Sequence, residues 1–315
     1  MRPSLSAIVP CYNEALALPL LYARLSAVLE SCFGYDYEVV LVNDGSSDST
    51  WIDIVDLAKL SSRVIGVDLS RNHGHQLAIT AGLSVSRGDL VVVLDADLQD
   101  PPELLPLMLA KLRESGADVV YGRRTKRTGE TLFKRTSAAL FYRLLSHVSS
   151  TSIPPDVGDF RLMTRRVVDL VNSMSEHQRF LRGMVSWVGF RQVAFDYERP
   201  SRAAGTTHYP LRKMVRLALD ALTSFSLAPL RASIYLGIIL TLSATAISSW
   251  VLWTFAVQGH VKGWQLVLAV VLVLAAIQML VIGLLGEYIG RIHEQTQARP
   301  LFIIREVFRA EVIAE

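Results

Sequence analysis

The sequence predicts an α/β fold with a Rossmann-like domain followed by a hairpin of two membrane-spanning helices. Over the first two hundred residues, short segments rich in β-branched residues alternate with segments of helical periodicity. Strands that are separated by helices of this length form right-handed βαβ units and a parallel sheet. The last third of the 315-residue chain instead contains two long stretches without a charge.

The alternation fixes the expected elements of the first domain. The expected strands are residues 6–10, 37–42, 64–69, 90–94 and 118–121. The expected helices are residues 16–31, a segment that ends near 60, 76–85 and 102–115. The pattern is typical of nucleotide-binding domains, although the chain has neither a GxGxxG fingerprint nor a P-loop.

Composition excludes several classes of protein. A net charge of +3 is too small to indicate a nucleic-acid partner. The two cysteines, Cys11 and Cys32, lack CxxC spacing, so neither a disulfide framework nor a zinc site is indicated. The N-terminus lacks the apolar core of a signal peptide. The hydrophobic content of 51% and the mean hydropathy of +0.33 are high for a soluble protein.

The excess of apolar residues lies in residues 232–257 and 264–286, which hold 26 and 23 uncharged residues. Each exceeds the roughly 20 residues that cross a bilayer, although a buried pair of soluble helices is the alternative. The flanking basic residues are Arg212, Lys213, Arg216, Arg231, Arg291 and Arg299, whereas the loop between the stretches has only Lys262. The positive-inside rule therefore predicts a multi-pass protein of the inner or plasma membrane with both termini in the cytoplasm. Residues 210–227 read as an amphipathic helix on the cytoplasmic face.

The stretch LVVVLDADLQDPPE, residues 90–103, has the clearest chemical pattern. A buried strand runs into Asp95, Asp97 and Gln99, and the carboxyl end of such a strand is where α/β sheets bind ligands. Two carboxylates and an amide oxygen suit Mg²⁺ or Mn²⁺, which share their remaining coordination positions with substrate phosphates. The alternative is an acidic loop that only ends the strand.

The loop after the second expected strand contains Asp44 followed by Gly45. A carboxylate at this edge can accept a hydrogen bond from a base N–H or a ribose hydroxyl, and the glycine permits close approach of the backbone. The alternative is an ordinary Asp-Gly turn that precedes a helix cap.

Four motifs together resemble one enzyme family. They are VPCYNE at 9–14, VNDGSSD at 42–48, RNHGHQ at 71–76 and DADLQDPP at 95–102. In this order and spacing they resemble the family 2 glycosyltransferases of GT-A fold, and within them the polyprenyl-phosphate glycosyltransferases such as the bactoprenol glucosyltransferases. The dolichyl-phosphate mannose synthases are less similar. The resemblance covers residues 4–210, and the membrane part agrees in layout.

The resemblance implies a domain layout and a set of site residues. The layout is a GT-A catalytic domain at 1–209, an amphipathic juxtamembrane helix at 210–230, two transmembrane helices at 231–288, and a cytoplasmic tail at 289–315 with a late strand near 301–304. The nucleotide sugar is expected at Pro10, Tyr12, Glu14, Asp44 and Asp95, and the metal at Asp95, Asp97 and Gln99. Arg199 and Arg202 belong to a loop that closes on the diphosphate, although Thr207 and His208 depart from the family pattern there.

The acceptor side is inferred in the same way. Segments YGRR at 121–124 and KRTS at 134–137 resemble the cradle of the acceptor phosphate, which points to Arg123, Arg135 and Ser137. A solvated basic surface beside a membrane is the alternative. The segment DVGDFRL at 156–162 resembles the one that carries the catalytic carboxylate, for which Asp159 is chosen over Asp156, with Asp97 as its catalytic partner.

The activity that this resemblance implies is a metal-dependent, inverting transfer of a hexose, glucose from UDP-glucose, to undecaprenyl phosphate or a similar lipid for cell-envelope glycosylation. A phosphate dianion is already a nucleophile, so Asp159 either acts as a base or positions the substrates. The alternatives are transfer of mannose from GDP-mannose to a dolichyl or polyprenyl phosphate, transfer of a modified pentose, and an inactive scaffold or sugar-lipid translocator. The expected partners are a UDP-sugar, the lipid, the membrane and copies of the same chain, as a tetramer by resemblance. His73 and His75 are expected to be structural or nucleotide-adjacent.

Overall fold

The computed structural model describes residues 3–124, 157–176, 179–198, 239, 249, 253, 256–257 and 263–310. The chain divides into two compact units. The first comprises Met1–Ser146, Thr151–Lys213 and Pro300–Glu315, and the second comprises His147–Ser150 and Met214–Arg299.

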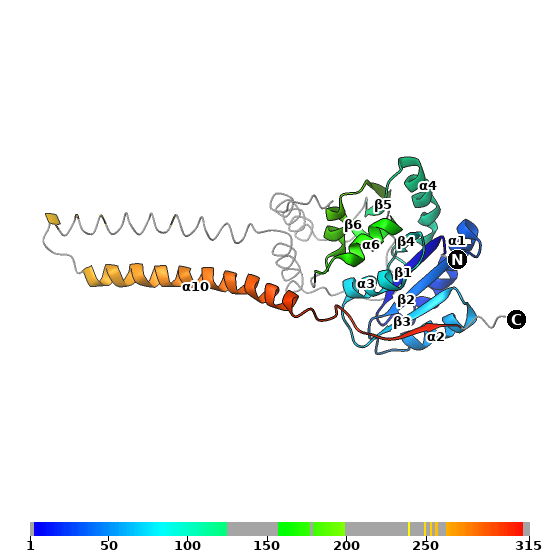
Figure 1. Ribbon diagram of the computed structural model, residues 1–315, viewed down its shortest axis with the longest axis horizontal. Helices are drawn as coiled ribbons and strands as arrows, with labels where there is room; N and C mark the ends of the chain where they lie inside the picture. Colours follow the sequence, from blue (N-terminus) through cyan, green and yellow to red (C-terminus); the bar gives the residue numbers. More distant parts are fainter. Residues whose placement is uncertain are drawn as a thin grey trace. The chain divides into compact units, whose positions relative to one another are not determined.

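The described strands of the first unit form one eight-stranded sheet in the order β7-β5-β6-β4-β1-β2-β3-β8 (Figure 1). The strands are β1 Leu5–Cys11, β2 Tyr37–Asn43, β3 Val64–Leu69, β4 Leu90–Val93, β5 Val119–Arg124, β6 Val157–Thr164, β7 Gln192–Tyr197 and β8 Ile304–Arg309. Strand β1 pairs in parallel with β2 and β4, and β2 does so with β3. Strands β5 and β7 are also parallel.

Helices cover both faces of this sheet. They are α1 Leu18–Phe33, α2 Thr50–Leu60, α3 His75–Val85, a 3₁₀ turn η1 Pro102–Leu104, α4 Leu105–Ser115, α6 Arg165–Ser173 and α7 Leu181–Val188. Helices α1, α2 and α4 pack in one apolar cluster, whereas α3, α6 and α7 pack in the other. Every residue of β1, β2 and β3 is buried, as expected for strands that are covered on both faces.

The expected strands and helices up to residue 121 are confirmed, with boundaries that shift by a few residues. The five expected strands run parallel to one another as predicted, but the sheet is mixed, because the unpredicted strand β6 lies antiparallel between β4 and β5 and β8 lies antiparallel to β3. Strand β6 contains Asp159 and Arg161, so its sequence lacks the continuous apolar run that would predict a strand. The late strand begins at Ile304 and not near residue 301.

The second unit is described mainly through helix α10, Gly263–Thr296, which is 34 residues long. It includes the second uncharged stretch of the sequence. The first such stretch, 232–257, lies almost wholly outside the described residues. Among the residues that are described, no helix is long and apolar enough to cross a membrane.

A buried contact from β7 holds the loop that follows β4. The hydroxyl of Tyr197 donates a hydrogen bond of 2.6 Å to Oδ1 of Asp100, and both residues are buried. The tyrosine ring packs edge-on against Phe160, with 5.7 Å between ring centroids. A Cβ at Gly122 would lie 2.8 Å from the Tyr197 ring and 2.9 Å from the Phe160 ring, so this position needs a glycine.

We expect Tyr197→Phe to lower the free energy of unfolding of the first unit by about 1–3 kcal/mol, because a buried carboxylate loses a hydrogen-bond donor. Tyr35→Phe is the matched control, since Tyr35 is 82% exposed, and its effect should stay within about 0.5 kcal/mol. Urea denaturation checks both values. Equal effects of the two substitutions would contradict the role given to this contact.

Candidate active site

The carboxylates of the DAD motif lie in the loop directly after β4. This loop continues the pairing with β1, because the Leu94 N–H donates to the Ile8 carbonyl at 3.1 Å. The Gln99 N–H donates to Oδ1 of Asp97 at 3.1 Å, which closes a local turn. Between them, Leu98 has a left-handed backbone with φ of 58° while its side chain is buried. Such a conformation costs a leucine on the order of 1 kcal/mol or more, so core packing fixes the path of the loop.

Asp95 lies in a strongly acidic environment. Burial, together with the nearby carboxylates of Asp100, Asp159 and Asp97, raises its pKa to about 6. The imidazole of His75 opposes this rise, with its Nε2 3.4 Å from Oδ1 of Asp95. A second positive charge at this position would stabilise the ionised form of Asp95 further.

Asp159 is surrounded by hydrogen-bond donors and cations, and its side chain is only 6% exposed. Arg182 donates to it from Nε and Nη2 at 3.1 Å each, and Gln76 donates from Nε2 at 3.0 Å. The His75 Nε2 lies 3.3 Å away, and the Arg161 Nη2 lies 3.6 Å away. Although burial alone would raise its pKa, these groups hold the pKa of Asp159 well below its usual range.

His75 therefore bridges a carboxylate in the loop after β4 and a carboxylate within β6. Burial lowers the pKa of its imidazole, but the hydrogen bond to Asp159 and the charge of Asp95 outweigh this and raise it. His75 and Gln76 are the first residues of helix α3, so the N-terminal end of this helix lies beside these carboxylates. A helix N-terminus favours negative charge nearby, which adds to the stabilisation of both groups.

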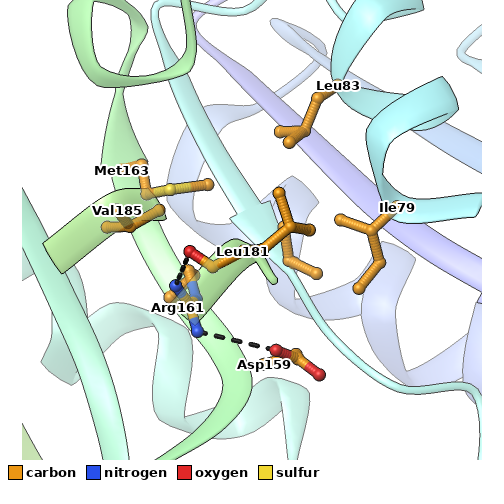
Figure 2. A pocket seen from close by; sticks show the side chains of 8 residues that line it. Ile79, Leu83, Asp159, Arg161, Met163, Leu181 and Val185 are labelled. Atoms are coloured by element: carbon orange, nitrogen blue, oxygen red, sulfur yellow. Dashed lines mark hydrogen bonds and ion pairs between the residues drawn. The ribbon is translucent and has the colours of Figure 1, made fainter. Parts of the chain in front are cut away.

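A small cavity lies beside Asp159 and Arg161 (Figure 2). Its other lining residues are Ile79, Leu83, Val93, Met163, Leu181 and Val185. Its volume of about 10 Å³ allows about one water molecule, so it is too small for a sugar. Arg161 donates to the carbonyls of Leu181 at 3.5 Å and Gly158 at 3.1 Å, and burial lowers its pKa to about 10. These contacts fix the Arg161 guanidinium beside the Asp159 carboxylate.

Asp44 joins two loops at the ends of β2 and β3. Its Oδ1 accepts a hydrogen bond from the His73 N–H at 2.7 Å, and its Oδ2 accepts one from the Gly74 N–H at 3.0 Å. Burial raises the pKa of Asp44 in spite of these bonds. Gly45 has φ of 65°, and a Cβ there would lie 2.5 Å from the backbone of Arg71. The close approach of the loops thus requires the Asp-Gly pair.

The first motif is attached to the NDGSSD loop by reciprocal bonds. The Asn13 N–H donates to the Ser46 hydroxyl at 3.0 Å, and Oδ1 of Asn13 accepts from the Ser47 N–H at 2.8 Å. Asn13 itself has a left-handed backbone with φ of 56°. The neighbouring Glu14 N–H donates to the Thr50 hydroxyl at 2.9 Å. Tyr12 remains 50% exposed beside these contacts, whereas Pro10 is buried within β1.

The residues expected on the acceptor side are only partly described. Arg123 on β5 is exposed and forms two hydrogen bonds with Asp196 of β7, at 2.6 and 2.8 Å. The other four residues expected to contact phosphate groups lie outside the described residues: Arg135, Ser137, Arg199 and Arg202.

Sequence reasoning missed three residues that the structure places at the carboxylates. His75 and Gln76 belong to the RNHGHQ motif, but neither was expected to touch Asp159. Arg182 lies at the start of α7, outside every motif named in the sequence. The RNHGHQ motif is the sequence signal that indicates a role for His75 and Gln76 at the site. No sequence pattern indicates such a role for Arg182.

The donor set at the end of β4 fits a hard divalent cation. Asp95 and Asp97 offer carboxylate oxygens within one loop, and Gln99 offers an amide oxygen. Within the described ranges, no group of three or more His, Cys, Asp or Glu side chains gathers as a metal centre. Mg²⁺ is commonly held by one or two carboxylates plus phosphate oxygens, so the chemistry of these residues suits it.

Comparison with known proteins identifies the family. Residues 6–171 match the model of glycosyl transferase family 2. An uncharacterized glycosyltransferase of Bacillus subtilis, YkcC, is 44% identical over 97% of this chain and 94% of its own. The prophage bactoprenol glucosyl transferase homolog of Escherichia coli is 38% identical over 96% of this chain and 99% of its own. The bactoprenol glucosyl transferase of Shigella phage SfX is 37% identical over 96% of this chain and 98% of its own.

The relatives align with nearly the whole chain, including the part beyond the catalytic motifs. The match to the family model runs from β1 into α6 and includes the carboxylates of Asp44, Asp95, Asp97, Asp100 and Asp159. The chain is a glycosyltransferase and belongs to glycosyl transferase family 2.

Proposed function

We propose that this glycosyltransferase transfers glucose from UDP-glucose to undecaprenyl phosphate or a similar polyprenyl phosphate. The observation that carries the proposal is the group of carboxylates at the end of β4, where Asp95 has a pKa raised to about 6. Such a site favours a cation and, with it, a diphosphate. The choice of sugar and acceptor is supported by the names of relatives that share 37–38% of their residues with this chain.

The acceptor supplies its own nucleophile. A phosphate monoester has a second pKa of about 6, so a dianion predominates at neutral pH. One phosphate oxygen attacks the anomeric carbon and forms the new C–O bond. The bond from that carbon to the diphosphate oxygen breaks, and the electron pair leaves with UDP. A single displacement inverts the anomeric configuration.

In this mechanism Asp159 positions its neighbours and does not act as the base. A carboxylate with a pKa held well below its usual range is a poor proton acceptor at neutral pH. Its bonds to Gln76 and Arg182 instead fix helices α3 and α7 against β6. Through His75 it also orients Asp95.

The cation of the proposed site is Mg²⁺ or Mn²⁺. Asp95, Asp97 and Gln99 are the residues that would hold it, and its charge would stabilise the diphosphate that departs. Asp44, Pro10, Tyr12 and Glu14 are proposed to receive the nucleoside. The exposed ring of Tyr12 offers an apolar face to a base.

The acceptor is proposed to meet the donor at the membrane surface. Arg123, Arg135 and Ser137 would bind its phosphate, and Arg199 and Arg202 would close on the donor diphosphate. The sequence supports a hairpin of two membrane helices at 231–288, with the catalytic domain at 1–209 and the tail in the cytoplasm. We also propose a homo-oligomer, with a tetramer as the expected form.

A transfer assay tests this function. Full-length protein in detergent is incubated with undecaprenyl phosphate, Mg²⁺ or Mn²⁺ and radiolabelled UDP-glucose, and label extracted into organic solvent is counted. We expect Asp97→Asn to lower the rate by at least about a hundredfold, because metal ligation stabilises charge in the transition state. Asp56→Asn is the control, since Asp56 is exposed on α2 and forms a surface ion pair with Lys59.

Parallel reactions with GDP-mannose and a UDP-pentose identify the donor. If only GDP-mannose gives lipid-bound label, the transferred sugar is mannose and not glucose. Absence of lipid-bound label with every donor, from protein that still binds UDP, would contradict a polyprenyl phosphate acceptor.

The role of Asp159 can be tested through the pH dependence of stability. Asp159→Asn leaves Arg161 and Arg182 without their carboxylate, so we expect a loss of about 3–5 kcal/mol at pH 7. Because the folded-state pKa is depressed, the carboxylate contributes its stability at every pH above about 4. The difference between wild type and variant in urea should therefore not shrink from pH 8 to pH 5, and it should grow as His75 is protonated, because Asp159 raises the pKa of that imidazole.

Asp169→Asn is the control for this experiment, because Asp169 is 64% exposed and lies 3.7 Å from Arg165. An exposed pair of this kind contributes less than about 1 kcal/mol. A difference for Asp159→Asn that shrinks between pH 7 and pH 5 would mean that Asp159 titrates in that range, as a general base would.

A further inference from the structure

The C-terminal strand β8 places an arginine on a buried carboxylate of β3. Arg305 donates from Nη1 to Oδ2 of Asp68 at 2.8 Å and from Nη2 to the carbonyl of Ser70 at 2.7 Å. The Asp68 side chain is only 2% exposed, whereas that of Arg305 is 60% exposed. The arginine thus reaches inward from the edge of the sheet to neutralise a charge that is shielded from water.

The other oxygen of Asp68 faces the NDGSSD loop. Its Oδ1 accepts a hydrogen bond of 2.7 Å from Nδ2 of Asn43, the last residue of β2. Oδ1 of Asn43 then accepts one of 3.1 Å from the Ser46 N–H. A continuous series of bonds therefore runs from Arg305 to the loop that carries Asp44.

The second contact of Arg305 reaches the partner loop of Asp44. Ser70 begins the segment that leads to His73 and Gly74, whose N–H groups bind the Asp44 carboxylate. The Ser70 N–H also donates to the carbonyl of Ile303 at 2.9 Å, just before β8. The C-terminal segment therefore holds both loops that meet at Asp44, one through side chains and one through the backbone.

We propose that Arg305 is a positioning residue for the nucleotide of the donor, an inference that rests on the proposed function. Loss of its guanidinium leaves the Asp68 carboxylate buried without this cation, and a buried charge in that state is relieved by rotation or by entry of water. Either change alters the bond from Asp68 to Asn43 and so displaces the Asp44 loop. Binding of the nucleotide should weaken, whereas binding of the acceptor should not.

The test compares Arg305→Ala, Arg305→Lys and Arg309→Ala in the full-length protein. Arg309 is the matched control, since it lies on the same strand four residues on and pairs in register with Ile65. Binding of UDP is measured by calorimetry, KM is measured for UDP-glucose and for undecaprenyl phosphate, and stability is measured in urea.

We expect Arg305→Ala to weaken UDP binding and raise the KM for the donor about tenfold, with the KM for the acceptor and kcat within about twofold. Arg305→Lys should recover most of this loss, because an ammonium group can still pair with Asp68. Arg309→Ala should bind UDP as the wild type does.

Two results would overturn the inference and leave the proposed function intact. One is wild-type UDP affinity in Arg305→Ala. The other is a parallel loss of stability, kcat and both KM values that lysine does not relieve, which would make Arg305 a structural residue of the sheet edge. Failure of the wild-type protein to bind UDP would instead refute the proposed function, and the inference with it.

Discussion

The constraint on which the active site depends is the repulsion among carboxylates at the end of β4. Asp95, Asp97, Asp100 and Asp159 lie close enough that three of them raise the pKa of Asp95. The fold relieves this repulsion in different ways. Arginines neutralise Asp159, a buried tyrosine hydroxyl bonds to Asp100, and an imidazole approaches Asp95. A divalent cation at Asp95 and Asp97 would complete the same balance of charge.

The antiparallel strand β6 contributes to this balance of charge. Strand β6 lies antiparallel to β4, so Asp159 and Arg161 come to the edge where β4 ends. Helices α3 and α7 then supply Gln76 and Arg182 from the same face of the sheet. The acidic site at which we propose that a cation and a diphosphate bind is therefore held by residues that keep Asp159 ionised at neutral pH.

Local patterns predicted the parallel half of the fold, because an apolar run or a helical period is visible within ten or twenty residues. They also predicted the DAD loop, where a buried strand meets acidic residues. They did not predict β6, whose Asp159 and Arg161 interrupt the apolar pattern. Nor did they predict contacts such as Tyr197 with Asp100 or Arg305 with Asp68, whose partners lie 97 and 237 residues apart. Such pairs depend on the order of strands, which no short window contains.

The most direct measurement is a titration of the full-length protein with Mn²⁺, followed by electron paramagnetic resonance, in the absence and presence of UDP. Two carboxylates leave coordination positions for phosphate oxygens, so we expect weak binding of Mn²⁺ alone and binding at least about tenfold tighter with UDP. Equal affinity with and without UDP, or no bound Mn²⁺ in either case, would contradict a shared site for metal and diphosphate at the end of β4.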